Sequence, residues 1–138
     1  MFKLIISFLL TTYFSAFNAQ TSNGYITSHV LDIGLGKPGP NIRACLYLKK
    51  RVGLNTDWNL IRSDISNQDG RFLNLSQNFT LVSGIYKIEF DMDSYYKAKD
   101  LYSFFPEVSI AFEVLDESQH YHVPLVTNQY GYSTYRGS

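Results

Sequence analysis

Cysteine, proline and unbalanced charge are all scarce in this sequence. Its one cysteine, Cys45, cannot form an internal disulfide and cannot supply the several thiolates of a cysteine-based metal site. Four prolines occur among 138 residues, and 12 basic residues balance 12 acidic ones. Because the basic residues are scattered as well as balanced, the sequence favours neither nucleic acid nor an anionic membrane as a partner.

Long apolar runs are missing too, except at the N-terminus. The opening segment, MFKLIISFLLTTYFSAFNA, carries Lys3, an apolar run from Leu4 to Leu10, and a small residue, Ala19, at its end. This composition is typical of a secretory signal peptide, and the run is too short for a membrane anchor. We therefore expect residues 1–19 to be removed. Residues 20–138 should then form one domain of an exported protein, periplasmic or secreted.

Long helical patterns are absent, whereas 11 tyrosines and 10 phenylalanines favour β-structure. Short alternating segments separated by turn signals indicate an all-β sandwich. The predicted strands are residues 25–32, 42–49, 58–64, 71–75, 84–91, 107–114, 120–126 and 130–135. One helix is predicted over residues 93–101, capped by Asp93 or Ser94, and residues 51–59 are predicted to be a surface loop. Pro124 predicts an edge, a bulge or a break in strand 120–126.

Three polar features do not belong to a simple sandwich. His29 shares a strand face with Thr27, and a single strand histidine is more often a surface residue than a catalytic one. Arg71 follows the Asp-Gly turn of NQDG and fits a solvated arginine at the start of a strand. His120 and His122 share one face of their strand. Together with His29 they supply three ligands for a zinc site, but no carboxylate at a metal-binding spacing accompanies them.

A small polar substrate would give these residues a common role. A guanidinium donates two parallel hydrogen bonds to a planar heterocycle with carbonyl edges, and a neutral histidine takes a proton from water. At the C-terminus, Gly137 permits close backbone approach, and Ser138 adds a hydroxyl and the terminal carboxylate. Such a set of groups suits hydrolysis of an activated amide without a metal or a cofactor.

Six short motifs occur in the same order as in a known family. They are HVLD (29–32), GKP (36–38), QDGR (68–71), SFFPE (103–107), YHVPL (121–125) and the terminal YRGS (135–138). On these motifs the chain resembles the 5-hydroxyisourate hydrolases, the transthyretin-related proteins, over essentially all of the expected mature chain. The terminal YRGS is the most specific of the six.

The resemblance implies hydrolysis of 5-hydroxyisourate, the product of urate oxidation, to 2-oxo-4-hydroxy-4-carboxy-5-ureidoimidazoline. It implies a transthyretin-like β-sandwich of two four-stranded sheets with one short helix, assembled as a homotetramer with its sites at the dimer–dimer interface. The family's catalytic positions fall on His29, Arg71, His122 and Ser138. Substrate contacts are expected from Arg71, Arg136, Gly137 and Ser138, and Arg136 is equally suited to a structural role. Either histidine could act as the general base.

Two other functions fit the same fold. A carrier would bind a small aromatic ligand in the channel between subunits without turning it over. Such a carrier has no need of the His29, Arg71, His122 and Ser138 set. An exported β-domain used for adhesion leaves the terminal YRGS unexplained, so the hydrolase is the favoured interpretation.

Overall fold

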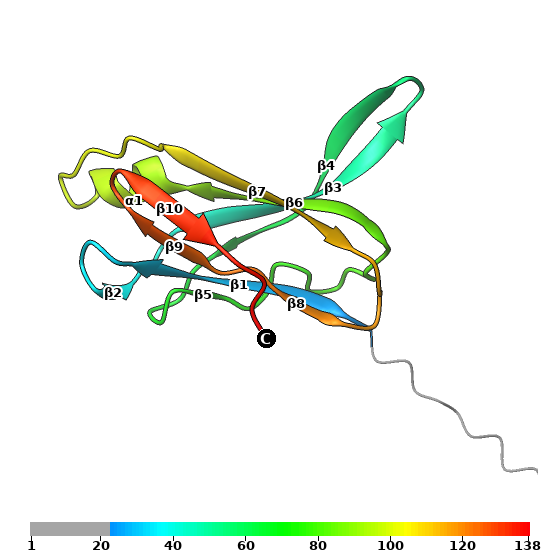
Figure 1. Ribbon diagram of the computed structural model, residues 1–138, viewed down its shortest axis with the longest axis horizontal. Coiled ribbons are helices and arrows are strands. Elements are labelled where there is room, and N and C mark those ends of the chain that lie inside the picture. The colour runs from blue at the N-terminus through cyan, green and yellow to red at the C-terminus, as the bar shows by residue number, and fades with distance from the viewer. Residues whose placement is uncertain (1–22) are drawn as a thin grey trace, which may run out of the picture.

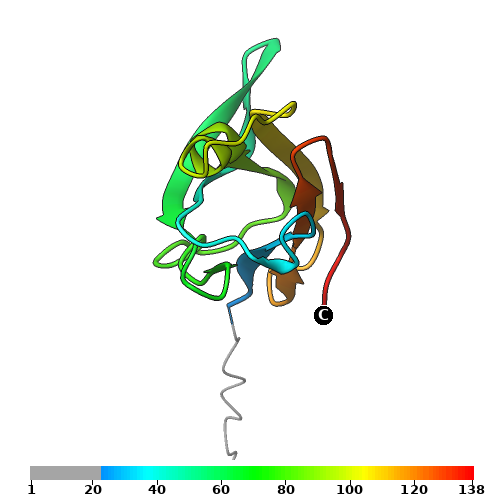
Figure 2. The ribbon, with the colours of Figure 1, turned by 90° about the vertical axis from the view of Figure 1, so that its left-hand side faces the viewer.

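The structure is a computed structural model that describes residues 23–138, so the predicted signal peptide lies outside the described residues. Two β-sheets pack face to face, and a short helix, α1 (Met92–Lys97), lies at one end of the sandwich (Figure 1). Figure 2 shows the two layers from that end. Within the described range, no helix is long and apolar enough to span a membrane.

The first sheet has four antiparallel strands in the order β4-β3-β6-β7. Their bounds are β3 (Arg43–Val52), β4 (Asn55–Ile65), β6 (Gly84–Asp91) and β7 (Glu107–Val114). Alternation directs one face of each central strand into the core: β6 buries Tyr86, Ile88 and Phe90 completely.

The second sheet is built around β1 (Tyr25–Asp32). Its main path, β10-β9-β1-β2, has four strands, and the short strands β5 and β8 also pair with β1. The bounds are β2 (Lys37–Pro38), β5 (Arg71–Phe72), β8 (His120–His122), β9 (Leu125–Asn128) and β10 (Gly131–Thr134). The predicted sandwich is therefore confirmed, with two short strands added to the second sheet.

The core lies between the sheets and draws large side chains from both. Ile26 and Val30 of β1 belong to the same buried cluster as Leu46 and Phe90 of the other layer, and all four are at most 1% exposed. Burying an aliphatic or aromatic side chain of this size stabilises the fold by about 1.5–3 kcal/mol. The outward-facing residues of β1, Thr27 and His29 among them, are thereby left on the opposite side of the sheet.

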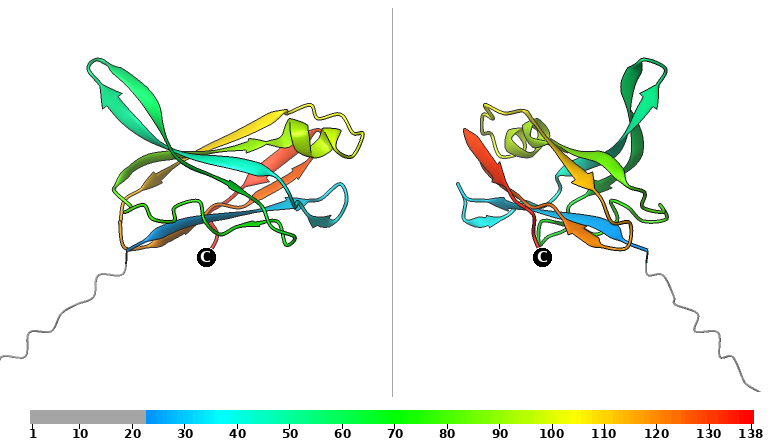
Figure 3. Two further views of the ribbon diagram at one scale, coloured as in Figure 1. Left: turned by 180° about the vertical axis from the view of Figure 1, so that it is seen from behind. Right: turned by 45° about the vertical axis from the view of Figure 1, so that its right-hand side comes forward.

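Two sequence predictions, one for the helix and one for the first sheet, are wrong. The helix begins at Met92 and its N-cap is Asp91, whose side chain accepts hydrogen bonds from the backbone N–H of Ser94 at 3.0 Å and from its hydroxyl at 2.7 Å. The cap is therefore neither Asp93 nor Ser94. Residues 51–59 are not a loop, because β3 and β4 continue as a paired hairpin that projects from the body (Figure 3).

The predicted strand 120–126 is divided into β8 and β9. Pro124 lies between them, where its missing N–H cannot contribute to the ladder. Both pieces pair with β1 in parallel, β8 with Tyr25–Thr27 and β9 with Val30–Asp32. The break predicted as one outcome of Pro124 is thus observed, directly beside His122.

Candidate active site

Three neighbouring strands bring the polar residues together on the outer face of the second sheet. His29 of β1 is the register partner of Arg71 of β5, and Thr27 of β1 is the register partner of His122 of β8. Directly opposed residues in neighbouring strands present their side chains on the same face. The sheet therefore places Arg71, His29 and His122 side by side, although they are far apart in sequence.

The turn before β5 holds Arg71 against β1. The Asn67 side-chain oxygen accepts hydrogen bonds from the backbone N–H of Asp69 at 3.0 Å and of Arg71 at 2.9 Å. Gly70 adopts a φ of 72°, and a Cβ on it would lie 2.5 Å from the carbonyl oxygen of Val30. Only glycine fits this turn without displacing β1, so the Asp-Gly signal in the sequence reflects a real requirement.

A continuous series of hydrogen bonds runs through the cluster. His29 Nδ1 lies 2.9 Å from His122 Nε2, and His122 Nδ1 lies 2.8 Å from the hydroxyl of Thr27. The same hydroxyl lies 2.6 Å from His120 Nε2. Both ring nitrogens of His122 are thus occupied by protein partners. Within residues 23–138, His29 Nε2 makes no hydrogen bond, and it is the nitrogen available to a water or a substrate.

Burial and charge keep the two central histidines neutral. Desolvation lowers the pKa of His29 below its usual 6.5, and the nearby positive charge of Arg71 lowers it further. The pKa of His122 is lowered mainly by desolvation, with contributions from His29, His120 and Arg71. A neutral imidazole at neutral pH is the form that can accept a proton.

The C-terminal segment is fixed against β8. The backbone N–H of Gly137 donates to the carbonyl of His122 at 2.8 Å, which forms an isolated antiparallel bridge. A Cβ on Gly137 would lie 2.5 Å from Cδ2 of the His122 ring. The backbone therefore passes directly over this ring, as the glycine in the terminal motif predicted, and Figure 3 shows the chain end beside β1 and β8.

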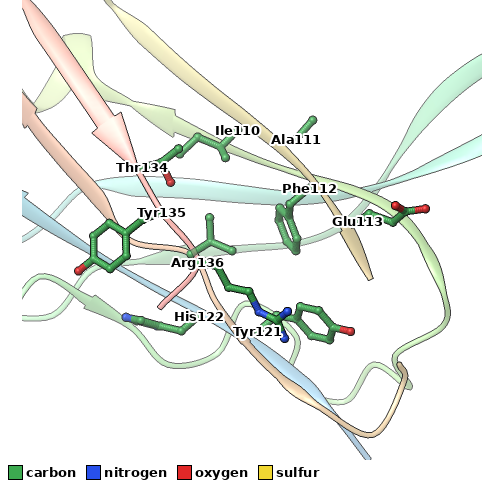
Figure 4. A pocket seen from close by; sticks show the side chains of 10 residues that line it. Ile110, Ala111, Phe112, Glu113, Tyr121, His122, Thr134, Tyr135 and Arg136 are labelled. Carbon is green, nitrogen blue, oxygen red and sulfur yellow. The ribbon is translucent and has the colours of Figure 1, made fainter. Parts of the chain in front are cut away.

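Arg136 has a position different from that of the other predicted site residues. Its guanidinium lies 5.2 Å from the ring centroid of Tyr121 and donates to the Gln119 side chain at 2.9 Å. In Figure 4 its side chain extends toward Tyr121, whereas the His122 ring points away from it. These contacts anchor the tail, which matches the structural role that the sequence left open for Arg136.

An open cavity of about 290 Å³ lies beside the cluster and is lined by His120 and His122 but not by His29. Its lining includes Arg71, His122 and Ser138, so three of the predicted catalytic residues face one space. A second cavity, of about 240 Å³, lies between β7 and the C-terminal segment and shares His122 with the first (Figure 4). The first is the candidate site, because it contains the guanidinium and the chain terminus.

Sequence reasoning missed Thr27 and His120 as parts of the site. Alternation alone shows that Thr27 shares a face with His29 and that His120 shares a face with His122. It does not show that β1 and β8 pair in parallel, which brings the two faces together. Among residues 23–138, no group of three or more histidine, cysteine or acidic side chains is arranged to hold a metal ion. The three histidines are instead joined through hydrogen bonds.

Comparison with known proteins identifies the family. The sequence pattern of the HIUase/Transthyretin family matches residues 26–137. The chain belongs to this family. A probable 5-hydroxyisourate hydrolase from Caenorhabditis elegans is 39% identical over 139 aligned positions that cover 100% of both chains. The resemblance inferred from the six motifs is confirmed.

Solved structures share the fold. The 5-hydroxyisourate hydrolase of Klebsiella pneumoniae superposes with a TM-score of 0.68 at 26% identity, over 82% of this chain and 92% of that one. Sea bream transthyretin in complex with thyroxine gives a TM-score of 0.74 at 22% identity, over 81% and 93% of the two chains. The transthyretin likeness shows the sandwich architecture alone.

Proposed function

We propose that this protein hydrolyses 5-hydroxyisourate to 2-oxo-4-hydroxy-4-carboxy-5-ureidoimidazoline, a step in urate breakdown. Family membership and the names of the C. elegans and K. pneumoniae relatives support this activity. The observation that carries the proposal is the convergence of Arg71, His29 and His122 from three strands beside the chain terminus.

His29 is the proposed general base. Both nitrogens of His122 are engaged by His29 and Thr27, so Nε2 of His29 is the position open to a water. Its lowered pKa keeps it unprotonated at neutral pH. As His29 takes a proton, the water oxygen bonds to a ring carbonyl carbon, the carbon–nitrogen bond breaks, and the proton goes to the leaving nitrogen. Such proton transfer accelerates reactions by about 10²–10⁴-fold.

Arg71 and Ser138 hold the substrate in this scheme. The Arg71 guanidinium stabilises the negative charge that develops on the attacked carbonyl oxygen and fixes the heterocycle through its paired donors. Ser138 lines the same cavity and contributes a hydroxyl for substrate or water. His122 orients His29 through the 2.9 Å contact.

The first test is direct. Urate oxidase generates 5-hydroxyisourate in a cuvette, and the purified protein should accelerate its ultraviolet decay at catalytic concentration. Arg71→Glu should abolish the acceleration without changing the oligomeric state. Arg51→Glu, with the same charge change at an exposed position on β3, is the matched control and should retain activity. An active Arg71→Glu enzyme would remove the guanidinium from the mechanism.

The same experiment decides between a hydrolase and a carrier. A carrier would bind an aromatic ligand stoichiometrically and leave the decay of 5-hydroxyisourate unchanged. The His29–His122 contact with Arg71 beside it favours turnover, because a carrier has no use for a neutral histidine pair with an open nitrogen.

The proposed assembly is a homotetramer with the sites at the interface between dimers. Two features of this surface support its burial by further copies of the chain. β7 and β10 are edge strands, which can pair with another chain. Tyr25 and Leu73 line the open cavity and are 50% and 63% exposed. Light scattering should give the mass of four chains. A monomer at micromolar concentration would contradict this assembly.

Export is likewise proposed from the N-terminal composition. The apolar run and the small residue Ala19 support cleavage at that point. Expression of the full chain in a secreting host should release a protein whose N-terminal sequence begins at Gln20. Retention of Met1 in the recovered protein would contradict export by a cleaved signal.

A further inference from the structure

The mechanism above leaves one histidine of the cluster without a role. His120 is joined to His122 only through the hydroxyl of Thr27, at 2.6 Å and 2.8 Å respectively. His122 continues to His29 at 2.9 Å. We call this series of four side chains, His29, His122, Thr27 and His120, the relay.

The relay has two proton arrangements when all three rings are neutral, because each hydrogen bond holds one proton. In the first, His29 Nδ1–H donates to His122 Nε2, His122 Nδ1–H donates to Thr27, and the Thr27 hydroxyl donates to His120 Nε2. His29 Nε2 is then bare, and His120 carries its proton on Nδ1.

In the second arrangement every donor and acceptor is exchanged. His120 Nε2–H donates to Thr27, Thr27 donates to His122 Nδ1, and His122 Nε2–H donates to His29 Nδ1. His29 Nε2 then carries a proton, and His120 Nδ1 is bare. The two arrangements contain the same number of protons, so a change from the first to the second takes up one proton at His29 and releases one at His120.

We propose that Thr27 and His120 are positioning residues that complete a proton relay, which presents His29 Nε2 first as a base and then as an acid. This proposal rests on the hydrolysis proposed above. In the first arrangement Nε2 takes the proton of the attacking water, and the oxygen–carbon bond forms. In the second arrangement Nε2–H gives a proton to the leaving ring nitrogen as the carbon–nitrogen bond breaks. Between these steps the relay holds one extra proton: His120 gains a proton on Nε2 and keeps the one on Nδ1, so its ring carries the positive charge. When His29 Nε2–H protonates the leaving nitrogen, the relay protons shift back and the first arrangement is restored.

The surroundings of His120 suit a transient positive charge. The Tyr25 ring stacks on the His120 ring with centroids 4.3 Å apart and planes at 17°, and an aromatic face attracts a cation. At the other end, the positive charge of Arg71 faces both His29 and His122 and disfavours a cation there. Charge is therefore more stable at the His120 end than beside Arg71.

The kinetic test uses three variants of the full enzyme. Thr27→Val keeps the shape of the side chain and removes the hydroxyl, and His120→Phe keeps the ring that stacks on Tyr25 and removes its nitrogens. Each should lower kcat by about tenfold to 100-fold with KM unchanged, the range expected for loss of a hydrogen bond to a charged group. Thr27→Ser restores a hydroxyl at the same position and should recover most of kcat. Wild-type kcat in Thr27→Val, or an equal loss in Thr27→Ser, would overturn the relay.

The spectroscopic test does not depend on the substrate. Nitrogen–proton correlation spectra of the wild-type histidine rings at pH 7.5 should show His29 protonated on Nδ1 and bare on Nε2. Thr27→Val should produce a mixture of His29 tautomers, because without the hydroxyl His120 no longer fixes the direction of the hydrogen bonds between His122 and His29. Unchanged tautomers in Thr27→Val overturn the relay even if hydrolysis is confirmed. The expected tautomers in an enzyme that leaves 5-hydroxyisourate untouched would instead overturn the proposed function.

Discussion

Replacement of Gly137 by alanine tests whether the chain terminus fixes the catalytic histidine. An added Cβ would lie 2.5 Å from Cδ2, 3.2 Å from Cγ and 3.3 Å from Cβ of His122. Carbon atoms in contact prefer about 3.5–4.0 Å, so the tail and the ring must separate by about 1 Å. His122 orients the proposed base, His29, and a misplacement of about 1 Å in a catalytic site lowers activity by about 100-fold. The expected result for Gly137→Ala is a loss of kcat/KM of that order.

The effect on stability should be small in comparison. The segment is terminal, and the interaction at risk is the single 2.8 Å hydrogen bond from Gly137 to the His122 carbonyl, worth about 1 kcal/mol. Gly131→Ala is the matched control, because the nearest atom to its added Cβ is Asn128 Oδ1 at 3.9 Å. Activity is followed by the decay of 5-hydroxyisourate, and stability by urea unfolding. Wild-type activity in Gly137→Ala would refute the claim that the tail positions His122.

Three further predictions follow from the same contacts. Gly70→Ala should destabilise the fold more than Gly36→Ala in urea unfolding. Both residues have positive φ, of 72° and 63°, but only the Cβ added at Gly70 meets a neighbour, the carbonyl oxygen of Val30 at 2.5 Å. Equal losses of stability would show that this contact is harmless. Asp32→Ala should cost about 2–3 kcal/mol, since the buried carboxylate accepts from the Tyr95 hydroxyl at 3.1 Å and from two backbone N–H groups, and no measurable loss would contradict this. The free energy of unfolding should fall as the pH drops below 6.5, because His29 and His122 bind protons in the unfolded chain at a pH where their lowered pKa values keep them neutral in the folded protein. Above pH 6.5 this contribution to stability is complete. A double His29→Asn, His122→Asn variant should therefore show a weaker fall between pH 7.5 and 5.5. An identical pH dependence in that variant would assign the effect to other groups.

Alternation identified the faces of the strands but not their neighbours. The shared face of His120 and His122 was predicted correctly, because side-chain direction depends on the local period of two. Pairing is a property of segments far apart in the chain. The register that sets Thr27 against His122 therefore could not be predicted, and the role of the Thr27 hydroxyl was missed with it.

The errors in the first sheet have a similar physical origin. Residues 51–57, at the tip of the β3–β4 hairpin, are exposed on both faces, Leu54 completely. No face of this tip is buried, so its side chains are not required to alternate between apolar and polar. The order of these residues comes from backbone hydrogen bonds between the two strands, which side-chain patterns do not report. The helix cap was misplaced because Asp91 and Asp93 are both suitable residue types, and only the geometry at the end of β6 selects Asp91.

The terminal motif gave the most information about the site for its length. Gly137 and Arg136 were singled out from the sequence, and the structure assigns them separate tasks: the glycine allows the backbone to cross the His122 ring, and the arginine ties the tail to Tyr121 and Gln119. Sequence alone could not separate these tasks, because both depend on which side of β8 the tail follows.

The most direct test of the account is the rate of 5-hydroxyisourate decay with wild-type protein and with His29→Asn. Asparagine retains a donor near the position of Nδ1, which can satisfy His122, but removes the open Nε2 to which the proposed mechanism assigns proton abstraction. The account predicts rapid decay with the wild type and a loss of about 100-fold or more in His29→Asn, with the oligomer intact. Equal rates for the two proteins would contradict the assignment of His29 as the base.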